Sequence, residues 1–245
     1  MSQLSQSDIA FFKAEGYLVV ENLLSAQELE YYSSLYDSFL SNKIDATKYR
    51  SDLSGGENDT VEKITQIMVP SKLVPDLLGM VYHKRALNIA QELLGNDMDL
   101  DFDMLINKAP NTDTITPWHQ DAAYWIDMPD KRAASCWMAI DPAFKENGCM
   151  WYTPKSHLKP LLPHEQTGNK GALKCSGTEA DSICVPLDPG SCVFHQGGTL
   201  HYSRGNSSSA NRRAFITNFR PKAMIELERL KGVDHTGERE IKSDL

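Results

Sequence analysis

The feature that most constrains the fold is a series of short apolar segments that begins near residue 99. Each segment is a few residues long and is bounded by residues that favour turns, such as Asp188-Pro189-Gly190. The segments are LDFDMLINKAP, ASCWMAID, GCMWYTP, SICVPLDPGSCVFH and RRAFITNFRP. Segments of this length are typical of strands, because helices usually need ten residues or more to bury one face. The pattern predicts a β-barrel or jelly roll over residues 99–222.

The first 98 residues have a different pattern, which indicates helices. Ser25 and Glu28 have the spacing of a capping box, and apolar residues follow at near-helical intervals as far as Leu40. Residues 71–95 also predict a helix, with a break near Pro75. We therefore expect one domain over residues 1–245, mainly β within the α+β class. In it, mainly helical residues 1–98 pack on one sheet of the 99–222 core, and residues 223–245 form a polar tail.

Charge and composition exclude several classes of function. The net charge is −8, and no run of Lys and Arg is long enough to follow a phosphate backbone, so we expect neither nucleic acid nor an anionic membrane surface as a partner. We find no signal-peptide pattern and no apolar run of about 20 residues that could span a bilayer. The five cysteines form no CxxC pair. These features predict a reduced, soluble, cytoplasmic protein.

The segment TPWHQDAAYW places His119 and Asp121 two residues apart, between Trp118 and the pair Tyr124 and Trp125. One interpretation is two thirds of a two-histidine, one-carboxylate site, a set that binds Fe(II) and leaves positions open for other ligands. The alternative is a polar turn between buried aromatic side chains. The motif alone does not decide between them, because short motifs match by chance. The candidates for a third ligand are His195 and His201.

The segment that follows these histidines adds a second constraint. Arg212 and Arg213 open an apolar strand soon after His201. Adjacent side chains of a strand point to opposite faces, so only one of the two can enter the barrel. A buried arginine needs an anionic partner, and its planar guanidinium binds a carboxylate through two hydrogen bonds. An inward-facing Arg212 would suit a dicarboxylate cosubstrate, with Arg213 in a surface ion pair.

Taken in order, these segments resemble the phytanoyl-CoA dioxygenase-like (PhyH) family of Fe(II)/2-oxoglutarate-dependent oxygenases. The resemblance runs from AFFKAEGYLVVENLLS to RRAFITNFRP, and it is strongest at MLINKAP, PWHQDAAYW, ENGCMWYTPKSH and PGSCVFHQGGTLHYSRGNSSSANRRA. It implies a double-stranded β-helix, the cupin-like form of the jelly roll. One departure is Lys155, which stands where the family commonly has glycine.

The resemblance also implies roles for individual residues. It assigns His119, Asp121 and His201 to iron, and Arg212 with Ser203 to the C5 carboxylate of 2-oxoglutarate. It places Met104 and Trp137 along the cosubstrate pocket, and Gln66 where some relatives contact 2-oxoglutarate with Lys or Gln. The implied requirements are Fe(II), 2-oxoglutarate and O₂, with release of succinate and CO₂.

The implied reaction is oxidation of an unactivated C–H bond of a small-molecule metabolite, most simply hydroxylation. Related halogenases lack the iron carboxylate, so the presence of Asp121 favours oxidation. Desaturation, demethylation and rearrangement remain alternatives within the class, and a non-catalytic cupin-like protein that binds a metal and a carboxylate is the alternative outside it. Residues 44–60 and 160–184 match nothing in the family and are candidates for substrate-facing loops or lids.

Overall fold

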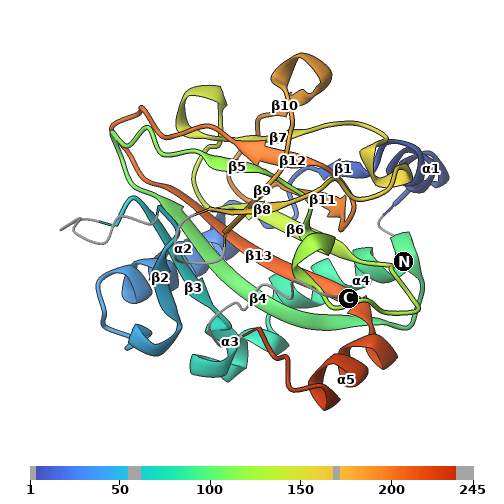
Figure 1. The fold of residues 1–245 in the computed structure, drawn as a ribbon. Coiled ribbons are helices and arrows are strands. Elements are labelled where there is room, and N and C mark those ends of the chain that lie inside the picture. Colours follow the sequence, from blue (N-terminus) through green and yellow to red (C-terminus); the bar gives the residue numbers. More distant parts are fainter. Residues whose placement is uncertain (1–3, 55–61, 168–171, 236–245) are drawn as a thin grey trace.

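The computed structural model describes residues 4–54, 62–167 and 172–235. Its centre is a seven-stranded sheet in the order β1-β11-β6-β13-β4-β3-β2, in which all neighbouring strands are antiparallel. The strands of this sheet are β1 (Tyr17–Val20), β2 (Arg50–Asp52), β3 (Ile64–Met68), β4 (Met98–Lys108), β6 (Ala134–Ala139), β11 (Cys192–Gln196) and β13 (Arg212–Pro221). The long strands β4 and β13 run side by side through the middle of the molecule (Figure 1).

A four-stranded sheet in the order β10-β7-β12-β5 completes the jelly roll. Its strands are β5 (Thr116–His119), β7 (Met150–Tyr152), β10 (Ile183–Val185) and β12 (His201–Ser203). A separate pair, β8 (Glu165–Thr167) and β9 (Ala172–Lys174), lies beside β5 within the segment that was expected to be a loop. The predicted jelly-roll core is confirmed.

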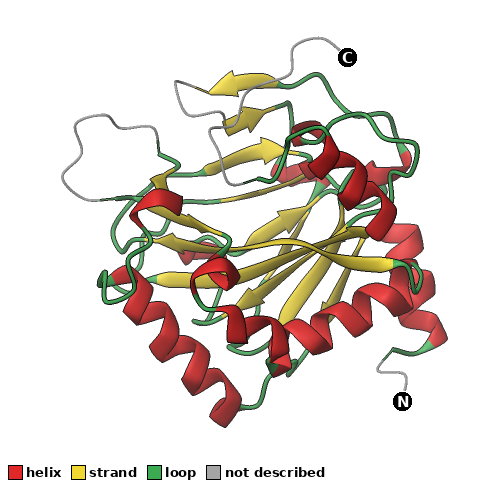
Figure 2. Ribbon diagram, turned by 90° about the horizontal axis from the view of Figure 1, so that it is seen from below, coloured by secondary structure: helices red, strands yellow, loops and turns green. Residues whose placement is uncertain are grey.

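The helices before residue 95 gather along one side of the large sheet, and the helix that follows β13 lies against the opposite side (Figure 2). They are α1 (Gln6–Glu15), α2 (Ala26–Leu40), α3 (Pro70–Leu73), α4 (Val81–Leu94) and α5 (Lys222–Leu230). The predicted capping box at Ser25 and Glu28 begins α2, and the expected break at Pro75 separates α3 from α4 with a short 3₁₀ helix. Within the described residues, no helix is long and apolar enough to cross a membrane.

Strand β13 shows how the sequence separates two cores. Phe215 and Phe219 pack with aromatic and aliphatic side chains of α1, α2 and α4. Ala214 and Ile216, on the other face, pack with residues of both sheets. This alternation is the one expected when Arg212 points between the sheets, and it gives each face of β13 a separate apolar layer.

Two boundaries differ from the sequence-based expectation. Besides β1, the mainly helical N-terminal third supplies the strands β2 and β3 to the large sheet. Residues 223–230, expected within a polar tail, belong to helix α5, which begins at Lys222. This helix looks polar in sequence because its buried contact is ionic: Glu228 is fully buried and accepts a hydrogen bond from Arg220. Residues 236–245 of the expected tail lie outside the described residues.

Candidate metal centre and cosubstrate pocket

Strand pairing brings together two histidines that are distant in sequence. His119 ends β5 and His201 begins β12, and the two residues are direct partners in the antiparallel register. Asp121 follows His119 at the start of the 3₁₀ helix Asp121–Tyr124. The ligand atoms of His119, Asp121 and His201 all lie within 4.8 Å of one another, so these three side chains could hold a metal ion.

The hydrogen bonds of the two imidazoles leave their Nε2 atoms free for a metal. Nδ1 of His119 lies 2.7 Å from the Pro117 carbonyl oxygen, and Nδ1 of His201 lies 2.8 Å from the Thr199 carbonyl oxygen. A carbonyl oxygen can only accept, so each Nδ1 carries a hydrogen and donates it. Both Nε2 atoms lie 3.6 Å from Oδ1 of Asp121. Lone pairs of three atoms therefore converge, an arrangement that a cation between them would stabilise.

The protonation states agree with this interpretation. Burial lowers the pKa of His119, and it lowers the pKa of His201 well below its ordinary value, so both rings are neutral at neutral pH. Burial alone would raise the pKa of Asp121. The neighbouring His201 and the hydrogen bond from His195 outweigh that effect and hold the pKa well below its usual range. Two neutral imidazoles and one carboxylate are the donor set that a divalent transition metal takes.

The second oxygen of Asp121 is held by the protein. Oδ2 accepts a hydrogen bond from the Ser135 hydroxyl at 2.7 Å and lies 3.1 Å from Nε2 of His195. Ser135 in turn accepts from Nδ2 of Asn218 at 2.8 Å, and Nδ1 of His195 lies 3.2 Å from the Tyr152 hydroxyl oxygen. Hydrogen bonds of this kind fix the orientation of a metal ligand, here with Oδ1 toward the two histidines.

Arg212 is a buried cation with unsatisfied donors. Its side chain is 1% exposed, its guanidinium lies 5.1 Å from the centre of the Trp137 ring, and its Nε and Nη1 atoms have no hydrogen-bond partner in the described structure. Burial lowers the pKa of Arg212 to about 10, which leaves it protonated at neutral pH. Buried donors without acceptors cost free energy, so the position favours an anion that can accept from both nitrogens.

Lys108 is buried beside Arg212. It is the register partner of Arg212, and its buried ammonium donates to the carbonyl oxygens of Thr114, Ser203 and Arg204. Burial and the charge of Arg212 lower the pKa of Lys108 well below its ordinary value. The three acceptors of Lys108 are neutral carbonyl oxygens. Among the residues that the structure describes, Nε and Nη1 of Arg212 have no carboxylate as a hydrogen-bond partner either. Arg212, which stays protonated at neutral pH, therefore supplies the positive charge for a bound anion.

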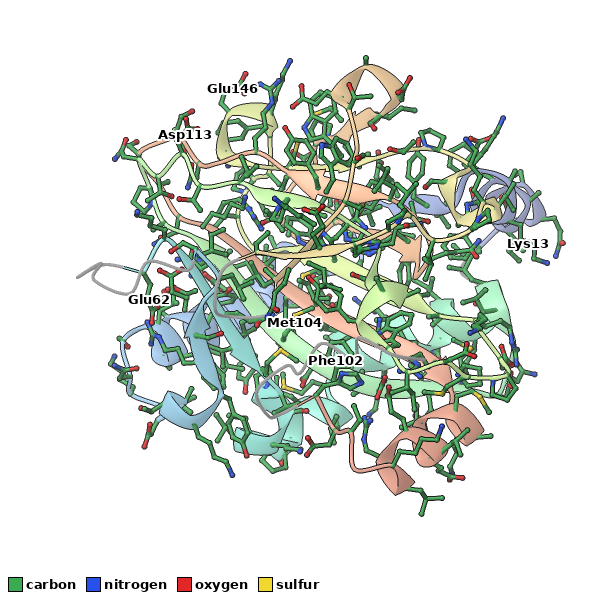
Figure 3. All side chains as sticks on the ribbon, in the orientation of Figure 1. Lys13, Glu62, Phe102, Met104, Asp113 and Glu146 are labelled. Carbon is green, nitrogen blue, oxygen red and sulfur yellow. The ribbon has the colours of Figure 1, made fainter. Side chains whose placement is uncertain are left out.

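A cavity of about 730 Å³ opens beside the candidate metal centre. Its walls include His119, Asp121, Gln66 and Met104, and the Gln66 amide lies 3.3 Å from the Met104 sulfur. Met104 and Phe102 share one face of β4 in the middle of the molecule (Figure 3). Arg212, Ser203 and Trp137 are buried and do not line the cavity in the described part of the chain. Gln66 and Met104 therefore line the cavity, whereas Arg212, Ser203 and Trp137 are enclosed behind its wall.

The sequence matches a known family over most of its length. The family model for phytanoyl-CoA dioxygenase (PhyH) matches residues 12–214, a range that contains all the predicted site residues. The chain belongs to the PhyH family.

Curated relatives of this PhyH-family chain are distant in sequence but extend along most of it. It is 26% identical over 262 residues to the phytanoyl-CoA dioxygenase domain-containing protein 1 of Danio rerio, covering 88% of this chain and 89% of the relative. It is 23% identical over 240 residues to the peroxisomal phytanoyl-CoA dioxygenase of Bos taurus, covering 88% of this chain and 68% of the relative.

Solved structures of other oxygenases share the fold of this chain. EvdO2 from Micromonospora carbonacea var. aurantiaca is 28% identical, with a TM-score of 0.76, and the match covers 89% of this chain and 91% of EvdO2. EvdO2 has also been solved with 2-oxoglutarate (26% identity, TM-score 0.75). The epimerase SnoN, solved with Fe³⁺, α-ketoglutarate and nogalamycin RO, shares the fold at a TM-score of 0.71 and 21% identity. Together with the His-Asp-His group, these findings identify the PhyH-family chain as an Fe(II)/2-oxoglutarate-dependent dioxygenase that uses O₂.

The aromatic residues around His119 divide between two roles in the PhyH-family fold. Trp118 stacks on Tyr202, with ring centres 4.3 Å apart, whereas Tyr124 and Trp125 line the cavity. Arg213 points away from Arg212 and forms ion pairs with Asp141 and Asp37. Tyr124 and Trp125 therefore belong to the cavity wall, whereas Trp118 is half-buried and packs on Tyr202.

Four residues of the site region were not recognised in the sequence: Ser135, Asn218, Arg220 and His235. Strand alternation provides a signal for two of them, because Ser135 shares a face with Trp137 and Asn218 shares a face with Arg212. Arg220 and His235 line the far part of the cavity. No local pattern marks His235, because its partners lie on other elements: Asp101 on β4 and Glu228 on α5.

Proposed function

We propose that His119, Asp121 and His201 hold Fe(II), that Arg212 anchors 2-oxoglutarate, and that the enzyme hydroxylates an unactivated C–H bond of a small molecule bound in the adjacent cavity. The observation that carries the proposal is the convergence of two unprotonated Nε2 atoms on Oδ1 of one ionised carboxylate, at the edge of a cavity. When bound, Fe(II) supplies the activation of O₂ that is coupled to the conversion of 2-oxoglutarate to succinate and CO₂.

The geometry favours His201 over His195 as the third ligand. His201 directs Nε2 at Oδ1 of Asp121, the same oxygen that His119 approaches. His195 instead approaches Oδ2, and its other ring nitrogen is engaged by Tyr152. His195 is therefore a positioning residue for Asp121, since it keeps the carboxylate turned toward the two ligand histidines.

Several enclosed residues support the proposed cosubstrate position. The Arg212 guanidinium would donate from Nε and Nη1 to the far carboxylate of 2-oxoglutarate, which would satisfy two buried donors at once. Trp137 supports the guanidinium from one face. Ser203 stands two residues after His201, on the same face of β12, and we assign its hydroxyl to the same carboxylate. Met104 and Gln66 would border the cosubstrate on the cavity side.

The cavity indicates the kind of substrate. Apart from the site residues, much of its wall is apolar, from Ile64, Ile106, Ile115, Tyr124, Ile126 and Leu173. A molecule with a substantial apolar part would fill it and exclude water from the iron. Asp121 is present and oriented by two hydrogen bonds, which supports hydroxylation over halogenation.

The test is a screen of small-molecule metabolites with the full chain, Fe(II), 2-oxoglutarate and O₂. Mass spectrometry of a true substrate should show the gain of one oxygen atom, together with one succinate released per turnover. A product that lacks two hydrogens, or a rearranged product of unchanged mass, would reject hydroxylation while keeping the enzyme class.

A further inference from the structure

The far end of the cavity has a cluster of five charged side chains, of which Asp101, Arg220 and Glu228 are buried. Arg220 comes from the end of β13, Asp101 from β4, and Glu228 and Arg229 from α5, while His235 lies beyond that helix. Arg220 and His235 line the cavity. The carboxylates of Asp101 and Glu228 are 0% exposed and do not line it in the described part of the chain. Two of the three cationic members, Arg220 and His235, therefore face the cavity, and the anionic members lie behind them.

The cluster has two arginines and two carboxylates, so the protonation of His235 sets its net charge. Nη1 of Arg220 lies 3.1 Å from Oδ2 of Asp101 and 2.8 Å from Oε2 of Glu228. Arg229 and His235 bind the same two carboxylates. Burial alone would lower the pKa of His235, but its hydrogen bonds to Asp101 and Glu228 and their charges raise it. With His235 protonated, three cations share two carboxylates.

The donors of Arg220 are also incompletely satisfied by oxygen. Both of its carboxylate contacts are made by Nη1, and Nη2 has the Met128 sulfur, 3.1 Å away, as its hydrogen-bond partner in the described structure. A thioether is a weak acceptor compared with a carboxylate. The guanidinium also lies 4.9 Å from the centre of the Trp125 ring, which itself lines the cavity. A buried Arg that packs on an aromatic ring of the cavity wall is in position to bind an anion arriving from the cavity.

We propose that this end of the cavity is a specificity site, in which Arg220, together with His235, binds a carboxylate of the substrate. The inference rests on the proposed function, because it takes the cavity to be the substrate site. It adds a substrate class: acids with an apolar body, bound with the carboxylate directed away from the metal centre.

The strand geometry indicates where such an acid would be oxidised. Asn218 is connected to Asp121 through Ser135, and Arg220 lies two residues further along β13. Two residues of a strand span roughly 7 Å. A substrate held by Arg220 would therefore present to the iron a carbon several bonds from its carboxylate.

Two other interpretations of the cluster are less favourable. Asp101, Glu228 and His235 are close enough to hold a metal ion, but both carboxylates already bind Arg220 and Arg229, so their charge is neutralised without one. The cluster also fastens α5 to β4, but Arg229 contributes to that contact from outside the cavity lining. A purely structural role does not require Arg220 and His235 to face the cavity.

The experiment measures binding of 4-phenylbutanoate and of its primary amide to the full chain, followed by tryptophan fluorescence, since Trp125 contacts Arg220. The variants are Arg220→Gln, His235→Gln and, as the matched control from the same cluster, Arg229→Gln. We expect wild type to bind the carboxylate roughly tenfold or more tightly than the amide, as a charge-assisted hydrogen bond would give. R229Q should keep this preference, H235Q should reduce it, and R220Q should abolish it.

Equal affinity of wild type for the acid and the amide would overturn the inference, as would an equal loss of preference in R229Q and R220Q. If R220Q fails to fold, the inference is tested by the preference of wild type for the acid over the amide and by the reduction of that preference in H235Q. Release of succinate by wild type with Fe(II), 2-oxoglutarate and O₂ is measured in parallel. Succinate release without a carboxylate preference rejects this inference alone, and a preference without succinate release rejects the proposed function alone.

Discussion

Nε2 of His195 lies 3.1 Å from Oδ2 of Asp121, whereas Oδ1 of the same carboxylate lies 3.6 Å from each of the two proposed ligand histidines. The two oxygens of Asp121 therefore have different surroundings. One is directed at the metal position, and the other accepts hydrogen bonds from the protein. The carboxylate would bind a metal through one oxygen and leave further coordination positions for the cosubstrate and O₂.

Removal of the Ser135 hydroxyl should weaken iron binding. Ser135→Ala deletes the 2.7 Å hydrogen bond to Oδ2 of Asp121, so the carboxylate is held less firmly in its ligand orientation. Loss of such an outer contact typically lowers metal affinity by about 10- to 100-fold. Anaerobic titration with Fe(II) measures the change. Ser207→Ala, which removes an exposed hydroxyl bonded to the Glu146 carbonyl, is the control and should bind Fe(II) like wild type. Wild-type affinity in the Ser135 variant would show that Asp121 does not need this contact.

Arg212→Ala should raise the KM for 2-oxoglutarate while the protein still binds Fe(II). Loss of a buried, charge-assisted pair of hydrogen bonds costs about 2–4 kcal/mol, which corresponds to a rise of well over tenfold. The neighbouring Arg213→Ala is the matched control, because Arg213 points to the opposite face and pairs with Asp141 and Asp37. We expect Arg213→Ala to lower the thermal midpoint and leave the KM unchanged. The reverse pattern would assign the cosubstrate to Arg213.

His235 should make stability depend on pH. Its pKa is raised in the folded protein by Asp101 and Glu228, although burial opposes the shift. A raised pKa means that the stabilisation is fully present below the unfolded value, about 6.5, and is lost as the pH rises through the folded value. The thermal midpoint of His235→Gln should therefore lie furthest below that of wild type near pH 6 and approach it at higher pH. A constant difference across this range would show that His235 is not protonated in the cluster.

Much of the candidate site could be proposed from the sequence because its residues have short-range signatures. His119 and Asp121 form a recognisable pair, and strand alternation separates Arg212 from Arg213. The jelly roll follows from short apolar segments with turns between them. The choice of His201 over His195 as the proposed third ligand rests on the family spacing. Both histidines lie near Asp121 in the structure, and the contacts that distinguish them arise only when the chain is folded.

The charged cluster at the far end of the cavity could not be predicted in the same way. Helix α5 has a polar sequence, and its packing depends on two ion pairs. One is with Asp101 of β4, far away along the chain, and the other is with Arg220 at the end of β13. Strand β3 joins the sheet by pairing with β4, and β2 joins it by pairing with β3. The segment that contains β2 is polar, so its sequence does not indicate a strand. Such elements are fixed by tertiary contacts, which outweigh local propensity.

The most direct test of the proposed metal centre is an anaerobic titration of the metal-free protein with Fe(II) and 2-oxoglutarate, followed by the charge-transfer absorbance of the chelate. With His119, Asp121 and His201 as the ligands, wild type should develop the absorbance at one Fe(II) per chain and only when both components are present. His119→Ala, with the same fold by circular dichroism, should develop none. The same absorbance and stoichiometry in His119→Ala as in wild type would contradict the assignment.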